Sequence, residues 1–279
     1  MKEIGVFKGL LLYFGIDFVA TIILVLLFGE NVSNNLIMCV SEVLILFFII
    51  KIGKVNREII KYSKLDFKNK FDVKEIMGIV ITQLALSIGI MMFLVSCCYI
   101  FLFGEVITEE VGSYYSDSVE LILAIIAIVI LIPIVEELIF RRIFFVRLAK
   151  KIGAIGSMIV TSIFFGILHE GLGIPGAIIF GIACCIIYMK YQNILIPISI
   201  HIINNAICMA VDVYDYFFTS TEVIEYVMTG SKIIGNLFIW GVILVVSLIV
   251  FTIFVIKNMK YITNNNEIFI NSDNSIVDK

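Results

Sequence analysis

Charged side chains are scarce in this sequence. Asp, Glu, Lys and Arg make up 15% of its 279 residues and hydrophobic residues make up 61%, whereas soluble domains carry about 25% charged residues. So few charges cannot cover a globular surface in water, so the composition excludes a soluble protein. The net charge of −3 also gives no reason to expect a nucleic-acid partner. The sequence therefore predicts a polytopic membrane protein with lipid as its surroundings.

Several chemical signatures are also missing. The six cysteines lie in apolar stretches without CxxC spacing, which favours a role in helix packing. The two histidines, His169 and His201, form no HExxH pair, and the absence of a GxSxG elbow argues against a serine protease. The first apolar stretch is followed by no A-x-A-like cleavage site, so we expect it to remain as a membrane helix. No internal repeat and no Pro-rich linker occur.

What the sequence does contain is a series of long apolar stretches. A membrane span needs about 20 mostly apolar residues. Eight stretches meet this length, at about 9–28, 36–52, 76–103, 119–141, 152–169, 173–190, 194–212 and 233–256. The expected fold class is therefore all-α, with about eight transmembrane helices.

The expected organisation follows from these spans and from the polar residues described below. Residues 1–118 hold the first three helices with their loops, and 119–212 form a core that carries the polar motifs. Residues 213–261 contribute the last membrane helix. The polar, Asn-rich segment 262–279 is expected to be a disordered tail.

Basic residues are distributed very unevenly between the loops. If both termini lie inside, 19 of the 20 Lys and Arg lie on the inner side and only Lys232 lies opposite. The segment 51–75 carries eight of these bases, whereas 104–118 carries four acids and no base. By the positive-inside rule the sequence predicts an N-in/C-in, multi-pass protein of a cell membrane.

Polar side chains inside the spans are the candidates for function, because each costs about 2.5–3.5 kcal/mol to insert when it is charged. Asp17 and Glu42 are each alone in their span and are most simply explained as contacts inside the helix bundle. The other ionisable and amide residues gather in three segments: Glu136, Glu137 and Arg141 in EELIFR, His169 in FGILH, and His201, Asn204 and Asn205 in HIINN.

Helix geometry assigns these residues to different faces. Glu137 and Arg141 are four residues apart and can pair on one face, while Glu136 lies about 100° around the axis. His201 and Asn205 share a face for the same reason. The midpoint of 136 and 169 is 152.5, close to the expected turn at 150–153. An antiparallel pair of helices would therefore bring Glu136 and His169 to the same height.

These side chains support more than one chemistry. A carboxylate can take a proton from water while an imidazole holds that water, and amide or imidazole N–H groups can stabilise an oxyanion. Alternatively, Glu136, His169 and His201 would hold a divalent metal that supplies hydroxide. A purely structural role, as polar contacts between helices, explains any one of these residues alone.

The three motifs in this order resemble a known family. EELIFR fits an EExxxR pattern, FGILH fits FxxxH and HIINN fits HxxxN. The set resembles the CPBP intramembrane proteases, which comprise the type II CAAX prenyl endopeptidases and the bacterial Abi proteins linked to bacteriocin processing and self-immunity. The resemblance covers roughly residues 119–212.

This resemblance implies peptide-bond hydrolysis in a membrane cavity formed by an eight-helix protein. By similarity, Glu136 with His169 would activate the water, and His201 with Asn205 would stabilise the oxyanion. Glu137 and Arg141, the ion pair expected beside Glu136, would support these catalytic residues. Zinc is implied only by the family's frequent description as metalloproteases, with the same Glu136, His169 and His201 as its ligands.

Two other functions remain open at this level. The first is a non-catalytic membrane protein that gives immunity to a bacteriocin, with the motifs kept as a structural core. The second is a small proton-coupled transporter, although the internal repeats typical of transporters are missing. For a protease, the family branch and the Ile, Lys and Asn bias indicate a bacterial plasma membrane. They favour a membrane-associated peptide or protein over a prenylated substrate.

Overall fold

The computed structural model describes residues 4–29, 31–55, 57–102, 106–111, 114–219, 222–227 and 229–263. Apolar helices form its body: α1 (Val6–Phe28), α2 (Asn34–Ile52), α4 (Val73–Tyr99), α8 (Ile174–Tyr191), α9 (Leu195–Phe218) and α10 (Gly230–Thr263). The expected all-α membrane fold is confirmed. Apart from its first two residues, the predicted disordered tail at 262–279 lies outside the described residues.

Seven helical stretches of the described chain, rather than eight, are long and apolar enough to cross a membrane. The difference lies in one stretch of 50 residues, Ser118–Ile167, which contains two of the predicted spans. It comprises α5 (Ser118–Ala124), η2 (Ile125–Leu131), α6 (Ile132–Glu137), η3 (Leu138–Phe145) and α7 (Val146–Ile167).

This stretch is bent back on itself at Gly153. The residue has a φ of 77°, a backbone conformation that glycine adopts without a steric penalty. The two arms then pack against each other, with the rings of Phe140 and Phe165 5.2 Å apart. Since the midpoint of 140 and 165 is also 152.5, the predicted antiparallel pairing around this turn is confirmed.

Side-chain caps and prolines mark several helix starts. Ser33, Asp72 and Asp117 each accept hydrogen bonds from backbone N–H groups in the first turn of α2, α4 and α5. Pro175 and Pro197 lie in the first turns of α8 and α9, where a missing N–H removes no helix hydrogen bond. These two prolines therefore begin helices rather than break them.

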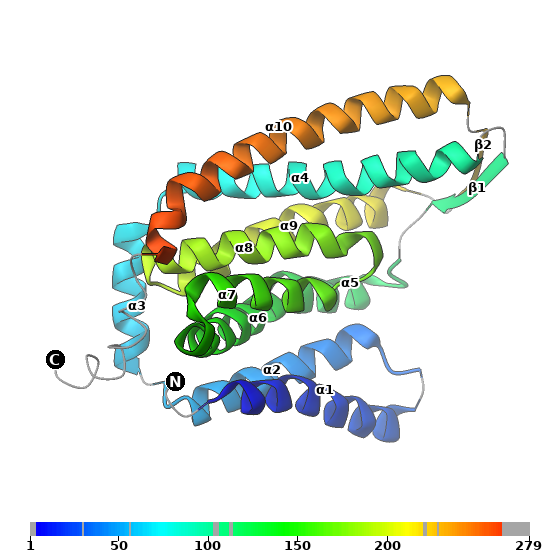
Figure 1. Ribbon diagram of the computed structural model, residues 1–279. Coiled ribbons are helices and arrows are strands. Elements are labelled where there is room, and N and C mark those ends of the chain that lie inside the picture. The colour runs from blue at the N-terminus through cyan, green and yellow to red at the C-terminus, as the bar shows by residue number, and fades with distance from the viewer. Residues whose placement is uncertain are drawn as a thin grey trace.

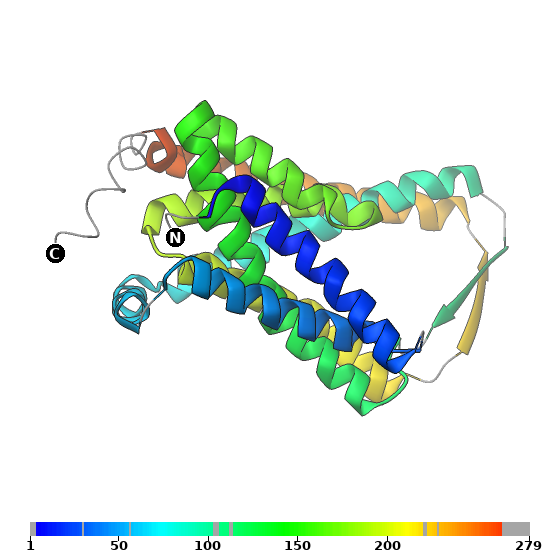
Figure 2. The same cartoon turned by 90° about the horizontal axis from the view of Figure 1, so that it is seen from below.

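The helices are arranged side by side with the folded-back stretch near the middle. In Figure 1, α4 and α10 form one edge, α8 and α9 lie next to α5, α6 and α7, and the α1–α2 hairpin forms the other edge. Figure 2 shows α1 crossing the bundle obliquely. In both views the start of α1 and the end of α10 lie at the same end as α3 (Arg57–Lys70).

Two elements were not expected from the sequence. The basic segment 51–75 contains the helix α3, which is attached to the bundle where Asn193 donates hydrogen bonds to the Ser63 carbonyl and to Asp66, each at 2.9 Å. Burial opposes ionisation of Asp66, but hydrogen bonds from Lys70 and Asn193 outweigh it and lower its pKa. At the other end of the bundle, β1 (Val106–Val111) pairs antiparallel with β2 (Glu222–Val227).

Small residues allow α7 and α8 to approach closely. A Cβ at Gly166 would lie 2.3 Å from Cγ1 of Ile178, and one at Gly181 would lie 2.9 Å from Cβ of Ser162. Such contacts between small residues are typical of membrane helix interfaces. They fix the end of α7, which leads directly into His169.

The orientation gives the first testable prediction. Because β1 and β2 pair, 106–111 and 222–227 lie together on one side of the bundle, and positive-inside asymmetry places that side outside. Single cysteines in a Cys-free background should react with an impermeant maleimide at 104–118 and 212–231 in intact cells. Cysteines at 51–75 and 141–151 should react only after permeabilisation. Protection of 104–118 in intact cells would reverse the orientation.

Candidate active site

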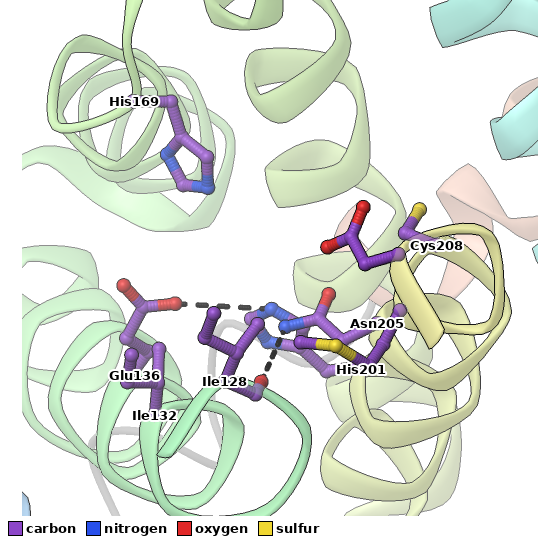
Figure 3. Close-up of a pocket in the computed structure, with 9 residues that line it drawn as sticks. Ile128, Ile132, Glu136, His169, His201, Asn205 and Cys208 are labelled. Carbon is purple, nitrogen blue, oxygen red and sulfur yellow. Dashed lines mark hydrogen bonds and ion pairs between the residues drawn. The ribbon is translucent and has the colours of Figure 1, made fainter. Parts of the chain in front are cut away.

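A cavity of about 280 Å³ lies between the folded-back stretch and α9. It brings together the four residues that the sequence nominated for chemistry, as Figure 3 shows. Its lining consists of Ile128, Ile132, Glu136, His169, His201, Asn205, Cys208, Met209 and Asp212. The convergence of three separate segments on one space is what a shared chemical role requires.

The two adjacent glutamates have different surroundings. Glu137 is fully buried and lies 3.1 Å from Nε of Arg141 through Oε2, so the predicted pair is present. The Arg141 guanidinium also stacks over the Phe165 ring at 4.4 Å. Glu136 points instead into the cavity. One carboxylate thus neutralises a buried cation, and the other faces the space where a substrate would bind.

His201 connects these two carboxylates. Its Nδ1 lies 3.1 Å from Oε1 of Glu137, and its Nε2 lies 3.8 Å from Oε2 of Glu136. Because a carboxylate only accepts hydrogen bonds, Nδ1 donates to Glu137. The Phe180 ring packs against the imidazole with centroids 4.8 Å apart. Glu137 and Phe180 therefore fix the ring so that its Nε2 edge faces Glu136.

His169 reaches the same cavity from the end of α7. Its Nδ1 lies 3.0 Å from the carbonyl oxygen of Phe165. A carbonyl can only accept, so Nδ1 carries the hydrogen and Nε2 is left with its lone pair when the ring is neutral. In Figure 3 His169 and Glu136 project from opposite walls into the same space. Nε2 of His169 is therefore an atom that can accept or hold a proton there.

Asn205 makes a contact that the sequence did not predict. Its Nδ2 donates to the backbone carbonyl of Ile128 at 2.9 Å. That carbonyl has lost both of its helical partners: the N–H of Ile132 bonds to Ala127 instead, and the residue five positions on is Pro133, which has no N–H. Asn205 therefore satisfies a backbone acceptor that the local helix geometry leaves open.

The cause of this open carbonyl is a change in helix type. Residues Ile125–Leu131 and Leu138–Phe145 are π-helical, with hydrogen bonds to the fifth residue rather than the fourth. π-helical turns are rare and occur frequently at functional sites. Here they flank α6, the six residues that carry Glu136 and Glu137.

The residues do not fit a metal site. Within the part of the chain that the structure describes, no group of three His, Cys, Asp or Glu side chains is placed to hold an ion. Nδ1 of His169 and Nδ1 of His201 both donate to oxygen acceptors, so only the Nε2 atoms of the two rings could face an ion. In the described structure these atoms and Glu136, the zinc ligand set implied by the family description, are not gathered closely enough for coordination.

Tyr13 is a site residue that the motifs could not reveal. Its hydroxyl donates to Oε1 of Glu136 at 3.4 Å, so it contacts the carboxylate oxygen that does not face His201. Tyr13 lies on α1, more than 100 positions from Glu136. A single tyrosine in an apolar helix belongs to no recognisable sequence motif. Its contact with Glu136 is seen only once α1 is packed against the core.

One comparison with known protein families matches part of this chain. Residues 118–207 match the family described as type II CAAX prenyl endopeptidase Rce1-like, so the resemblance to CPBP proteases is confirmed. The matched segment contains Glu136, His169, His201 and Asn205. No curated protein and no solved structure is significantly similar to this chain.

Proposed function

Because residues 118–207 of a multi-pass membrane protein match the Rce1-like family, we propose that this chain is an intramembrane endopeptidase. It hydrolyses a peptide bond of a membrane-associated peptide or protein with a water activated by Glu136 and His169. The observation that carries the proposal is the single cavity into which both side chains project, together with His201 and Asn205.

The proposed reaction begins with a water held between Glu136 and Nε2 of His169. Glu136 takes one proton from that water as its oxygen bonds to the carbonyl carbon of the substrate. A tetrahedral intermediate results, with negative charge on the former carbonyl oxygen. The C–N bond then breaks as the proton held by Glu136 passes to the leaving nitrogen. One water is consumed, and a carboxylic acid and an amine are formed.

His201 and Asn205 are proposed to stabilise the charge that develops on the oxygen. Glu137 accepts from Nδ1 of His201, and the Nε2 atom of that ring donates to the oxyanion in the form of the ring that carries a hydrogen on both nitrogens. Asn205 uses one N–H on Ile128, and a carboxamide has a second N–H to offer. Donors fixed before the reaction are effective because they need no reorientation as charge develops.

A membrane-associated peptide undergoing maturation, or a bacteriocin removed in self-immunity, is the proposed class of substrate. The non-catalytic immunity protein is the competing proposal, because binding alone would not require Glu136 to accept a proton. The test is cleavage of a membrane-anchored peptide by the purified chain in lipid nanodiscs, with products identified by mass spectrometry. We expect cleavage by the natural chain. Immunity that persists in the Glu136→Gln variant would favour the binding role.

Asn205→Ala gives a second prediction from this site. The variant loses an oxyanion donor, so we expect kcat to fall by roughly 10²–10³-fold with little change in KM. It also leaves the Ile128 carbonyl unpaired, so the free energy of unfolding should fall by about 1–3 kcal/mol. Asn204→Ala is the matched control, because Asn204 does not line the cavity and, among the described residues, its amide donates to Asn205 without contacting Ile128. A raised KM with kcat intact would instead make α9 a substrate-binding surface.

A further inference from the structure

The cavity is elongated along two helices. On α9 its lining residues are His201, Asn205, Cys208, Met209 and Asp212, and on the facing arm they are Ile128, Ile132 and Glu136. Both sets recur at steps of three or four residues, with Met209 beside Cys208, so each set forms a stripe along one helix face. The cavity thus runs away from Glu136 and His201 between two parallel walls.

Its two ends differ from its middle. Ile128, Ile132 and Met209 make the middle apolar, while Asp212 places a carboxylate at the end far from His201. Eleven residues separate His201 from Asp212, which corresponds to about 16 Å at 1.5 Å per residue. An extended peptide has room for about five residues over that length at roughly 3.3 Å each.

Asp212 is held in place by a neutral partner. The hydroxyl of Tyr115 donates to Oδ2 of Asp212 at 3.3 Å. Burial and the Asp212 charge raise the pKa of Tyr115 to about 12, so it remains a donor at neutral pH. Among the described side chains no Lys, Arg or His forms an ion pair with Asp212. Its charge is thus oriented but not neutralised at the end of a mostly apolar space.

The surroundings of this end carry more acids than bases. The segments 104–118 and 212–232 hold eight acids, Asp212 included, and one base, Lys232. Asp212 is half-buried where the cavity ends. A cation that arrives with the substrate would therefore meet an oriented carboxylate that forms no ion pair with a base among the described side chains.

We propose that Asp212 determines specificity by binding a cationic group of the peptide substrate, a Lys or Arg side chain or an α-amino group, about 16 Å from the cleaved bond. The inference rests on the proposed protease function and names its substrate class. The apolar middle of the cavity receives the residues between the cleaved bond and the cation. Tyr115 keeps the carboxylate aimed along the cavity.

The test uses palmitoylated, internally quenched peptides of apolar residues that carry one Lys, or Gln in its place, at each position along the probe. Cleavage is measured with the full chain in phosphatidylcholine nanodiscs. Binding is measured by fluorescence anisotropy with the Glu136→Gln chain, which separates recognition from hydrolysis. A charge-assisted hydrogen bond predicts a Lys-to-Gln preference of about 10- to 100-fold, greatest when Lys lies about five residues from the cleaved bond.

Asp212→Asn should reduce that Lys-to-Gln ratio to about one, and Asp212→Glu should retain part of it. Asp215→Asn is the matched control, because Asp215 accepts from Thr219 and does not line the cavity. It should keep the full ratio. A ratio near one in the natural chain, or a ratio unchanged by Asp212→Asn, would overturn the assignment.

The two proposals fail in different ways. If the probes are cleaved without a Lys preference, proteolysis stands and the role of Asp212 is wrong. If the Glu136→Gln chain binds Lys probes selectively through Asp212 but the natural chain cleaves none of them, recognition stands and hydrolysis is wrong.

Discussion

Glu136→Gln is expected to abolish peptide-bond cleavage while the protein accumulates at close to its normal level. Gln keeps the shape of Glu and can still accept from Tyr13, which contacts Oε1, but it cannot take a proton from water. Loss of a positioned general base costs roughly 10²–10⁴-fold in rate. Turnover per folded protein should be measured in nanodiscs, with the folded fraction taken from size-exclusion chromatography.

A matched control exists on α2. Glu42 is also a buried carboxylate, with 7% of its surface exposed, but it lies outside the cavity lining. Glu42→Gln therefore tests whether removing any buried carboxylate near the core reduces turnover. An equal loss of turnover in Glu42→Gln and Glu136→Gln would show that the effect is not specific to the proposed base.

Glu137→Gln is expected to have the opposite effect, a severe loss of folded protein. Glu137 and Arg141 are 0% and 1% exposed in a contact of 3.1 Å, and removing one partner of a buried pair costs about 3–5 kcal/mol because the other charge is left uncompensated. The ring of His201 would also lose the carboxylate that holds its Nδ1. Accumulation and thermal unfolding of the variant in detergent measure the effect.

A rescue experiment separates charge imbalance from lost catalysis. In Glu137→Gln/Arg141→Met both charges are removed, so accumulation should recover relative to the single variant. Turnover should remain low, because a neutral amide at 137 supports a charged His201 ring less well than the carboxylate does. A normally accumulating Glu137→Gln protein would mean that structure and chemistry are assigned to the wrong glutamates.

The fold could be predicted as far as hydropathy and charge determine it. The predicted spans coincide with the described helices because lipid requires long apolar helices, and the turn at Gly153 lies where the basic residues between two apolar stretches predicted it. The strand pair could not be predicted, since 106–111 and 222–227 are far apart in sequence and neither segment signals the other. Helix α3 could not be predicted either, because its many charged residues leave no long apolar stretch.

The candidate site could be predicted where one helix carries both partners. The spacing of Glu137 and Arg141 fixes their contact, because residues four apart share a helix face. The contact of Asn205 with Ile128 depends on a π-helical stretch that has no sequence pattern, and on Pro133 five residues after the carbonyl. The approach of Tyr13 depends on how α1 crosses the bundle, which its uniform apolar composition does not determine.

The central claim is that water attacks a peptide bond in the cavity of Glu136, His169 and His201. Its most direct measurement is mass spectrometry of the products after single turnover in water enriched in ¹⁸O. We expect one labelled oxygen in the new C-terminal carboxylate formed by the natural chain, and no product from Glu136→Gln at equal amounts of folded protein. Unlabelled product from the natural chain, or labelled product at the normal rate from Glu136→Gln, would contradict the account.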